Sequence, residues 1–264
     1  MKSTWSDFKQ ADDTIFHPFR KIFYAETENE YQTLYLSIPK KEGKKPLVIF
    51  FHGGGMTGGG RECPGDLFNG EYVIAEPRYR LSPAVHAPAH MEDAASAVQW
   101  CFAHAEELNI DKKKIFVGGM SAGAYLAAIT VMDQKYLAPY GLSYRDLAGL
   151  LLISGQMTTH FRIKADLGRD NGIYNPLVDE YAPLSYLSAD LPPILLVTGE
   201  SSLDMPARPE ENAFVAASLR SMGHPFVRYY ALNGHDHGGV FHSCDFVILR
   251  FIQEVLAKSE KTPL

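Results

Sequence analysis

A serine between glycines is the first residue whose surroundings suggest chemistry. Residues 118–124 read GGMSAGA, which places Ser121 in a G-x-S-x-G pattern running from Gly119 to Gly123. The pattern follows the apolar run KIFV and precedes an alanine-rich stretch typical of a helix. Between a strand and a helix, it predicts a sharp, strained turn that exposes the serine hydroxyl as a nucleophile. A glycine-rich turn without a catalytic role would fit the same residues, so further motifs must decide.

A glycine tract supplies the second motif. Residues 52–55 read HGGG and directly follow the apolar run PLVIFF. Backbone N–H groups in such a tract face a substrate carbonyl oxygen without side chains in the way, which predicts an oxyanion hole. We expect its donors to be Gly53, Gly54 and Ala122. A phosphate-binding loop is the competing interpretation, but the following glycines lack both the Lys-Ser/Thr pair and the direct continuation into a helix that such a loop needs.

A histidine base is expected near the C-terminus, because serine alone is a weak nucleophile at neutral pH. The stretch NGHDHGG spans residues 233–239 and carries two imidazoles. We expect His237, which glycines follow, to be the base, and His235 to be a loop residue. A zinc site on the His-x-His spacing is the alternative for this stretch, although no third ligand with a recognisable spacing stands out.

An orienting acid is expected in the loop GESSLDMPAR, residues 199–208. Asp204 is the expected acid, because it lies further out on this loop, where a carboxylate can reach a histidine arriving from the next strand. Glu200 is the reserve. A serine, an acid and a histidine in this order would cleave acyl bonds through an acyl-serine intermediate.

Strands and helices must hold these residues in place. Short β-rich runs alternate with helical patterns, which predicts an α/β fold with a mainly parallel sheet covered on both faces. Several runs are continuously apolar, as strands buried on both faces require. The predicted strands are 31–39, 46–51, 71–79, 114–119, 147–154, 192–199 and 225–232. The predicted helices are 91–108, 209–222 and 245–258.

The segment 155–191 interrupts this alternation. It is irregular and rich in Tyr, Asp and Pro, and a stretch of this length without periodicity is usually functional. No internal repeat or shift in composition marks a boundary, so residues 1–264 are expected to form a single domain. We expect the active site to be lined by this segment, by the loop after HGGG, and by the N-terminal segment with Trp5, Phe8, Phe16 and Phe19.

Composition limits the partners. The 264 residues include 31 acidic and 25 basic side chains, and the formal charge of −6 has the wrong sign for neutralising the phosphates of a nucleic acid. Three widely spaced cysteines suggest no disulfide framework, and no motif requires a cofactor or a metal. The N-terminus lacks a signal-peptide core and no apolar run is long enough to span a membrane, so a cytoplasmic protein is expected. The expected partner is a small-molecule ester. The sequence leaves open whether the protein forms a homo-oligomer.

A third stretch carries a resemblance to a known family. YRLSPAVHAPAHMEDAASAVQW, residues 79–100, resembles a segment of α/β-hydrolases of the hormone-sensitive-lipase-like carboxylesterase group. Together with HGGG and the serine turn, the similarity in order and spacing runs from about residue 30 to the C-terminus. It implies an α/β-hydrolase fold and hydrolysis of carboxylic esters. The matching positions in this third stretch are Arg80, Pro83, Pro88, Asp93 and Trp100.

Two features depart from that group. Met120 precedes the serine where the group usually has an acidic residue, and the acid loop is longer than usual. Residues 206–208, 210–212 and 236–238 read PAR, EEN and DHG, and they resemble bacterial esterases that act on acyl groups of carbohydrates. Arg80 and Asp93 are expected to be structural, as an arginine and a helix-opening carboxylate that stabilise their own turn.

Other functions use the same fold. An amidase or an arylformamidase would employ identical machinery, and a peptidase would usually carry an added domain. A non-catalytic protein that binds a small molecule is the third alternative, since fold alone does not give function. The chain keeps all three catalytic residue types in order, which favours an enzyme.

Overall fold

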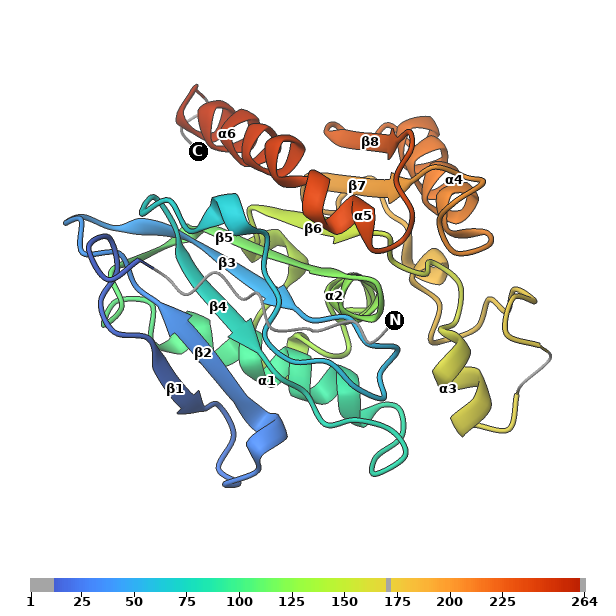
Figure 1. Cartoon of the computed structure of the whole chain (residues 1–264), viewed down its shortest axis with the longest axis horizontal. Helices are drawn as coiled ribbons and strands as arrows, with labels where there is room; N and C mark the ends of the chain where they lie inside the picture. Colours follow the sequence, from blue (N-terminus) through green and yellow to red (C-terminus); the bar gives the residue numbers. More distant parts are fainter. Residues whose placement is uncertain (1–11, 170–171, 262–264) are drawn as a thin grey trace.

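An eight-stranded sheet organises the chain (Figure 1). The computed structural model describes residues 12–169 and 172–261. The strands are β1 (Arg20–Phe23), β2 (Thr33–Ser37), β3 (Lys45–Phe51), β4 (Val73–Pro77), β5 (Ile110–Met120), β6 (Gly149–Ile153), β7 (Ile194–Gly199) and β8 (Val227–Leu232). Their order in the sheet is β1-β2-β4-β3-β5-β6-β7-β8. β2 is antiparallel to both of its neighbours, and the remaining neighbours are parallel.

Alternate residues of the central strands pack on opposite faces of the sheet. In β6, Leu150 and Leu152 belong to one buried apolar cluster, whereas Leu151 and Ile153 belong to the other. Successive side chains of a strand point to opposite faces, so a strand covered on both sides must be apolar at every position. The continuous run GLLLI therefore reflects burial on both faces.

Helices cover the two faces. The helices are α1 (Ala89–Ala103), α2 (Ala122–Met132), α3 (Phe161–Asp166), α4 (Arg208–Ser221), α5 (Gly239–Ser243) and α6 (Asp245–Lys261). Apolar residues of α1, α2 and α4 join the cluster on one face, and those of α6 join the cluster on the other. In Figure 1, α1 and α6 lie on opposite sides of the sheet. None of the helices in the described part of the chain combines the length and apolar character needed to cross a bilayer.

The predicted α/β architecture is confirmed, with a mainly parallel sheet. Each predicted strand and helix has a counterpart in the structure. Strand β1 was not predicted, because its residues RKIF are largely exposed and contain no apolar run. The segment 155–191 is irregular apart from α3 and the 3-10 turn Pro183–Tyr186.

One predicted helix was too long. The expected helix 91–108 ends as α1 at Ala103, because the chain turns there to enter β5. The ring of His104 stacks on Trp100 with centroids 4.0 Å apart, and the Ile110 N–H donates to the Ala105 carbonyl oxygen at 2.7 Å. Ala105 and Leu108 are buried in this turn, which explains why they continued the apolar pattern.

The Arg80–Asp93 pair holds the start of α1 to the strand edge. The guanidinium of Arg80 lies 2.7 Å from Asp93 Oδ1, and the Arg80 N–H donates to Asp93 Oδ2 at 2.9 Å. Gln32 Nε2 donates to the same carboxylate at 2.8 Å. Asp93 is only 1% exposed, so these contacts compensate a buried charge.

Candidate active site

Ser121 occupies a strained turn between β5 and α2. Its backbone has φ 55° and ψ −116°, a conformation that an L-residue rarely adopts. A Cβ on Gly119 would lie 2.4 Å from the carbonyl carbon of Gly123, and a Cβ on Gly123 would lie 2.0 Å from the carbonyl oxygen of Phe51. Only glycine fits at the two flanking positions, so the pattern follows from the close approach of strand and helix.

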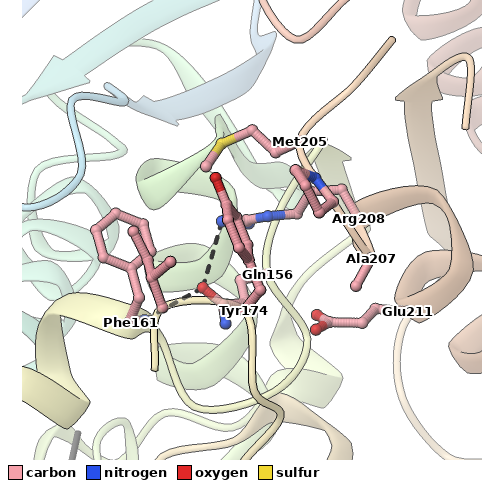
Figure 2. Close-up of a pocket in the computed structure, with 9 residues that line it drawn as sticks. Gln156, Phe161, Tyr174, Met205, Ala207, Arg208 and Glu211 are labelled. Atoms are coloured by element: carbon pink, nitrogen blue, oxygen red, sulfur yellow. Dashed lines mark hydrogen bonds between the residues drawn. The ribbon is translucent and has the colours of Figure 1, made fainter. Parts of the chain in front are cut away.

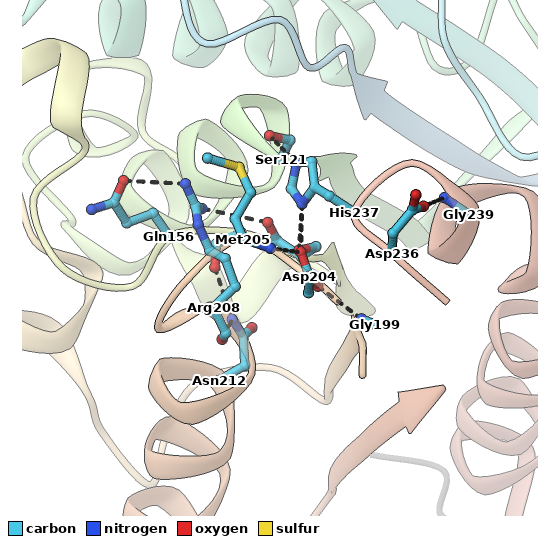
Figure 3. A network of polar contacts seen from close by, with 12 residues as sticks. Ser121, Gln156, Gly199, Asp204, Met205, Arg208, Asn212, Asp236, His237 and Gly239 are labelled. Carbon is cyan, nitrogen blue, oxygen red and sulfur yellow. Dashed lines mark hydrogen bonds and ion pairs between the residues drawn. The ribbon is translucent and has the colours of Figure 1, made fainter. Parts of the chain in front are cut away.

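His237 connects the serine to an acid. It lies in the loop after β8, and its Nε2 is 2.8 Å from Ser121 Oγ. Its Nδ1 is 2.7 Å from Asp204 Oδ1 (Figure 3). The structure therefore brings the three residues that the sequence placed far apart into one line of hydrogen bonds. A neutral imidazole in this line donates from Nδ1 to the carboxylate and accepts at Nε2 from the hydroxyl.

Asp204 is held as a carboxylate. The N–H groups of Gly199 and Met205 donate to it at 2.8 and 2.7 Å, and His237 contacts it from the opposite loop. Burial alone would raise the pKa of Asp204, but hydrogen bonds from His237, Gly199 and the Ser154 hydroxyl outweigh burial and lower that pKa below its ordinary value. An ionised acid fixes the imidazole tautomer and stabilises the imidazolium.

The reserve acid Glu200 and the neighbouring imidazole of His235 lie apart from this line. Glu200 accepts hydrogen bonds from the Ser202 hydroxyl and the Gly234 N–H, both at 2.7 Å. The Glu200 N–H donates to the His235 carbonyl oxygen at 2.9 Å, so Glu200 fastens the acid loop to the histidine loop. The ring of His235 contacts the Asn233 carbonyl oxygen at 2.9 Å. The geometry favours Asp204 and His237.

Ser154 is a neighbour of the line that the sequence did not reveal. It follows β6, is fully buried and has φ 46°. Its hydroxyl donates to Asp204 and lies 3.0 Å from His237 Nδ1. In the sequence it is the final residue of a predicted strand, which carries no signal of this contact.

The glycine tract differs from expectation at one donor. The Gly53 N–H does not face an open site, because it donates to Glu62 Oε2 at 2.6 Å. The N–H groups of Gly54 and Ala122 have no protein acceptor within the ranges that the structure describes. Of the three expected donors, Gly54 and Ala122 are therefore available, and Gly53 is engaged by a side chain nine positions further along the chain.

His52 fixes the tract from its other side. Its Nδ1 contacts the Gly53 carbonyl oxygen at 2.8 Å, and its ring stacks on Tyr79 with centroids 4.4 Å apart. Burial lowers the pKa of His52 to about 4, so the ring is neutral and its Nδ1–H can donate. C=O and N–H point in opposite directions in a trans peptide. The Gly54 N–H therefore points away from His52.

A pocket adjoins the acid loop (Figure 2). Gln156, Phe161, Ile173 and Tyr174 line it from the segment 155–191, and residues 205–208 line it from the acid loop. The segment 155–191 therefore lines a pocket beside the acid loop, and Ser121 and His237 are not among the residues that line it.

Arg208 and Glu211 are the charged residues that line this pocket, and Arg208 is buried. It is 3% exposed, and burial lowers its pKa to about 10. Its guanidinium reaches the Ser154 carbonyl oxygen at 3.4 Å and Gln156 Oε1 at 3.3 Å, which ties the start of α4 to the segment beside the acid.

The N-terminal aromatic residues lie elsewhere. Trp5 and Phe8 fall outside the described residues. Phe16 and Phe19 line a separate hollow with Lys40 and Arg61, and no residue of the acid loop belongs to it. Phe16 packs edge-on against Phe68, which explains its burial. Phe16 and Phe19 therefore line this hollow and not the pocket beside the acid loop.

Metal ligands do not gather around the histidine loop. Across residues 12–169 and 172–261, no group of three or more His, Cys, Asp or Glu side chains is arranged to hold a metal ion. The two nearby imidazoles diverge, since His237 faces Ser121 and His235 contacts backbone.

Comparisons with known proteins agree with this geometry. The prolyl oligopeptidase family matches residues 87–258, and BD-FAE matches residues 34–139. Esterase LipI of Mycobacterium tuberculosis is 32% identical over 93 residues, which cover 33% of this chain and 29% of that protein. An arylesterase of Saccharolobus solfataricus is 28% identical over 223 residues, which cover 75% of this chain and 70% of that protein. The solved structure of a truncated carbohydrate esterase from gut microbiota has a TM-score of 0.78 at 17% identity, over 93% of this chain and 98% of that one.

These matches differ in the share of each protein that they cover. This chain spans 29% of the length of LipI, whereas the structural match extends over nearly the whole fold. The prolyl oligopeptidase match extends over more than half of the chain and includes Ser121, Asp204 and His237. The chain therefore belongs to the prolyl oligopeptidase family, and the resemblance to α/β-hydrolase carboxylesterases indicated by its sequence motifs is confirmed.

Proposed function

We propose that this protein is a serine carboxylesterase that hydrolyses short-chain acyl or aryl esters. One observation carries the proposal: Asp204, His237 and Ser121 are joined by contacts of 2.7 and 2.8 Å, with the serine on a strained turn. Similar proteins are named as an esterase and an arylesterase, which supports the same chemistry.

In the acylation step, Ser121 Oγ attacks the ester carbonyl carbon while His237 Nε2 takes the hydroxyl proton. The carbonyl oxygen becomes an oxyanion, for which two N–H groups are the donors: that of Gly54 in the loop after β3, and that of Ala122 at the N-terminus of α2. Asp204 stabilises the imidazolium that forms. The carbon–oxygen bond to the alcohol then breaks, and the alcohol leaves with the proton from His237.

In the deacylation step, water replaces the alcohol. His237 takes a proton from the water as its oxygen attacks the acyl-serine carbonyl carbon. The second tetrahedral intermediate uses the same two N–H donors. Its collapse releases the carboxylic acid and returns the proton to Ser121 Oγ, which restores the enzyme without a cofactor.

Acylated carbohydrates are the first natural substrates to test. The stretches PAR, EEN and DHG resemble bacterial esterases of that kind, and one structural neighbour is titled a carbohydrate esterase. A panel of p-nitrophenyl esters and acetylated sugars should show turnover by the wild type. Ser121→Ala should lower it by roughly 10⁴- to 10⁶-fold. A wild-type protein that hydrolyses no ester in this panel would contradict the proposal.

An amidase or arylformamidase is the second candidate, because the same residues can cleave a carbon–nitrogen bond. The match to the prolyl oligopeptidase family is the reason for retaining this candidate. Matched substrates that differ only in an ester or an amide link, such as p-nitrophenyl acetate and p-nitroacetanilide, separate the two. Faster cleavage of the amide, or of N-formylkynurenine, would favour this candidate. Binding without turnover would favour a non-catalytic protein.

A further inference from the structure

Glu62 is an acidic residue of the site that the proposed mechanism does not use. Its Oε2 accepts the Gly53 N–H at 2.6 Å. A Cβ built on Gly53 would lie 3.3 Å from Glu62 Oε2 and 3.4 Å from Ser121 Cβ. A methyl group at Gly53 would therefore be in close contact with both the Glu62 carboxyl group and the Ser121 side chain.

Glu62 completes a clamp on two successive peptides of the glycine tract. Tyr79 donates to the His52 carbonyl oxygen at 2.9 Å, and Glu62 accepts the N–H of the same peptide. The next peptide is held at its carbonyl oxygen, Gly53 O, by His52 Nδ1. Both peptide planes are thus fixed, and of their polar groups the Gly54 N–H is left without a protein partner in the described ranges.

Among the residues that the structure describes, no positive charge offsets the burial of Glu62. Burial raises the pKa of Glu62 to about 7, and the Gly53 N–H offsets only part of this effect. Tyr79 is neutral because burial raises its pKa far above the physiological range, and His52 is neutral because burial lowers its pKa. The nearest cation on the same loop, Arg61, is paired with Glu76 at 2.7 Å. Arg78 also lies in this region, where its charge helps to lower the pKa of His52, but it does not contribute to the shift of Glu62. The other ionisable groups that interact with this region are Cys63, Cys244 and Asp245.

We propose that Glu62 is a positioning residue for ester hydrolysis: it holds the Gly53 peptide so that the Gly54 N–H faces the oxyanion. This inference rests on the proposed esterase function. A neutral carboxyl group performs the task as well as a carboxylate, because its carbonyl oxygen still accepts the Gly53 N–H. An ionised Glu62 adds negative charge beside the forming oxyanion and opposes it. The turnover number should therefore decline as Glu62 ionises.

Three variants test the positioning role. Glu62→Gln keeps an acceptor oxygen without charge, Glu62→Ala removes the acceptor, and Glu71→Gln changes an exposed glutamate paired with Lys41 as a control. At pH 6.5, Glu62→Ala should lower kcat by roughly 10- to 100-fold with little change in KM, the size expected for a mispositioned oxyanion donor. Glu62→Gln should keep kcat within about threefold of the wild type and should lack the alkaline decline, while Glu71→Gln should follow the wild type.

A second readout does not depend on turnover. In NMR spectra recorded over a range of pH, the amide resonance of Gly53 in the wild type should shift with a midpoint near the pKa of Glu62, about 7. In Glu62→Gln it should not shift. The inference is overturned if the Gly53 amide is indifferent to pH, or if Glu62→Ala matches the wild type in kcat from pH 6 to 9. Failure of the esterase proposal would look different, because the Gly53 amide would still titrate in a protein that hydrolyses no ester.

Discussion

The Ser154 hydroxyl lies 2.9 Å from Asp204 Oδ1 and 2.8 Å from Asp204 Oδ2, so it contacts both oxygens of the acid. It also lies 3.0 Å from His237 Nδ1, close enough to compete with the acid for the same proton. Ser154 follows β6, whereas Asp204 follows β7, so this contact joins the ends of two neighbouring parallel strands. It limits the acid to one orientation before substrate binds.

Ser154→Ala should therefore weaken catalysis without abolishing it. A hydrogen bond to a charged group contributes about 1.5–3 kcal/mol, which sets a loss of roughly 10- to 100-fold in kcat with little effect on KM. Ser202→Ala is the matched control, because that hydroxyl donates to Glu200 instead. Steady-state kinetics on one activated ester compares the two. Equal activity of Ser154→Ala and Ser202→Ala would show that the contact has no catalytic role.

The identity of the acid is tested by a second matched pair. Asp204→Asn keeps the size of the side chain but favours the wrong imidazole tautomer, and it should lower kcat by about 10⁴-fold. Glu200→Gln should cost roughly threefold or less, since Glu200 only fastens two loops near the surface. Both are measured on the same ester, with KM as a check on binding. A large loss of kcat in Glu200→Gln, together with a near-normal kcat in Asp204→Asn, would reverse the assignment.

Gly123→Ala tests why the serine turn needs glycine. The added methyl group would lie 2.0 Å from the Phe51 carbonyl oxygen, so β3 or α2 must shift. Overpacking of this kind costs about 1–3 kcal/mol, or more where backbone is in the way. Thermal unfolding should show a melting temperature lower by several degrees. Gly60→Ala, where a methyl group meets nothing within 4 Å, should melt like the wild type. Equal melting of both variants would refute the packing explanation.

Two buried histidines predict a loss of stability in mild acid. Burial lowers the pKa of His52 and of His90 to about 4, from an ordinary value of 6.5. Between these values the unfolded chain binds protons that the folded chain does not, so the free energy of unfolding falls as pH drops through this window. Each residue accounts for roughly 3 kcal/mol over the full interval.

Thermal unfolding from pH 7 to pH 4 measures this loss. His90→Gln should lose less stability over the interval than the wild type, because the titration of His90 is gone. His90 is preferred for the test because it lies outside the proposed mechanism and contacts Ser82 Oγ at 3.2 Å. A variant with the same pH dependence as the wild type would show that His90 is protonated in the folded protein at the same pH as in the unfolded chain.

The sequence predicted the residues whose constraints are local. Continuous apolar runs such as LAGLLLIS indicated buried parallel strands, and the glycines around Ser121 recorded a close approach of strand and helix. The roles of Glu62 and Ser154 were not predicted from the sequence, because their contacts arise only in the folded chain. Glu62 looks like an ordinary loop charge and Ser154 like the polar end of a strand. The assignment of Gly53 failed for the same reason, since its N–H is taken by Glu62.

The central claim is that Ser121 is the nucleophile and that His237 activates it. Treatment with a fluorophosphonate, followed by peptide mass spectrometry, tests it most directly because the covalent adduct records which residue attacked. The adduct should be on Ser121, form quickly in the wild type and in His235→Ala, and form far more slowly in His237→Ala. An adduct on another residue, or equally fast labelling in His237→Ala, would contradict the account.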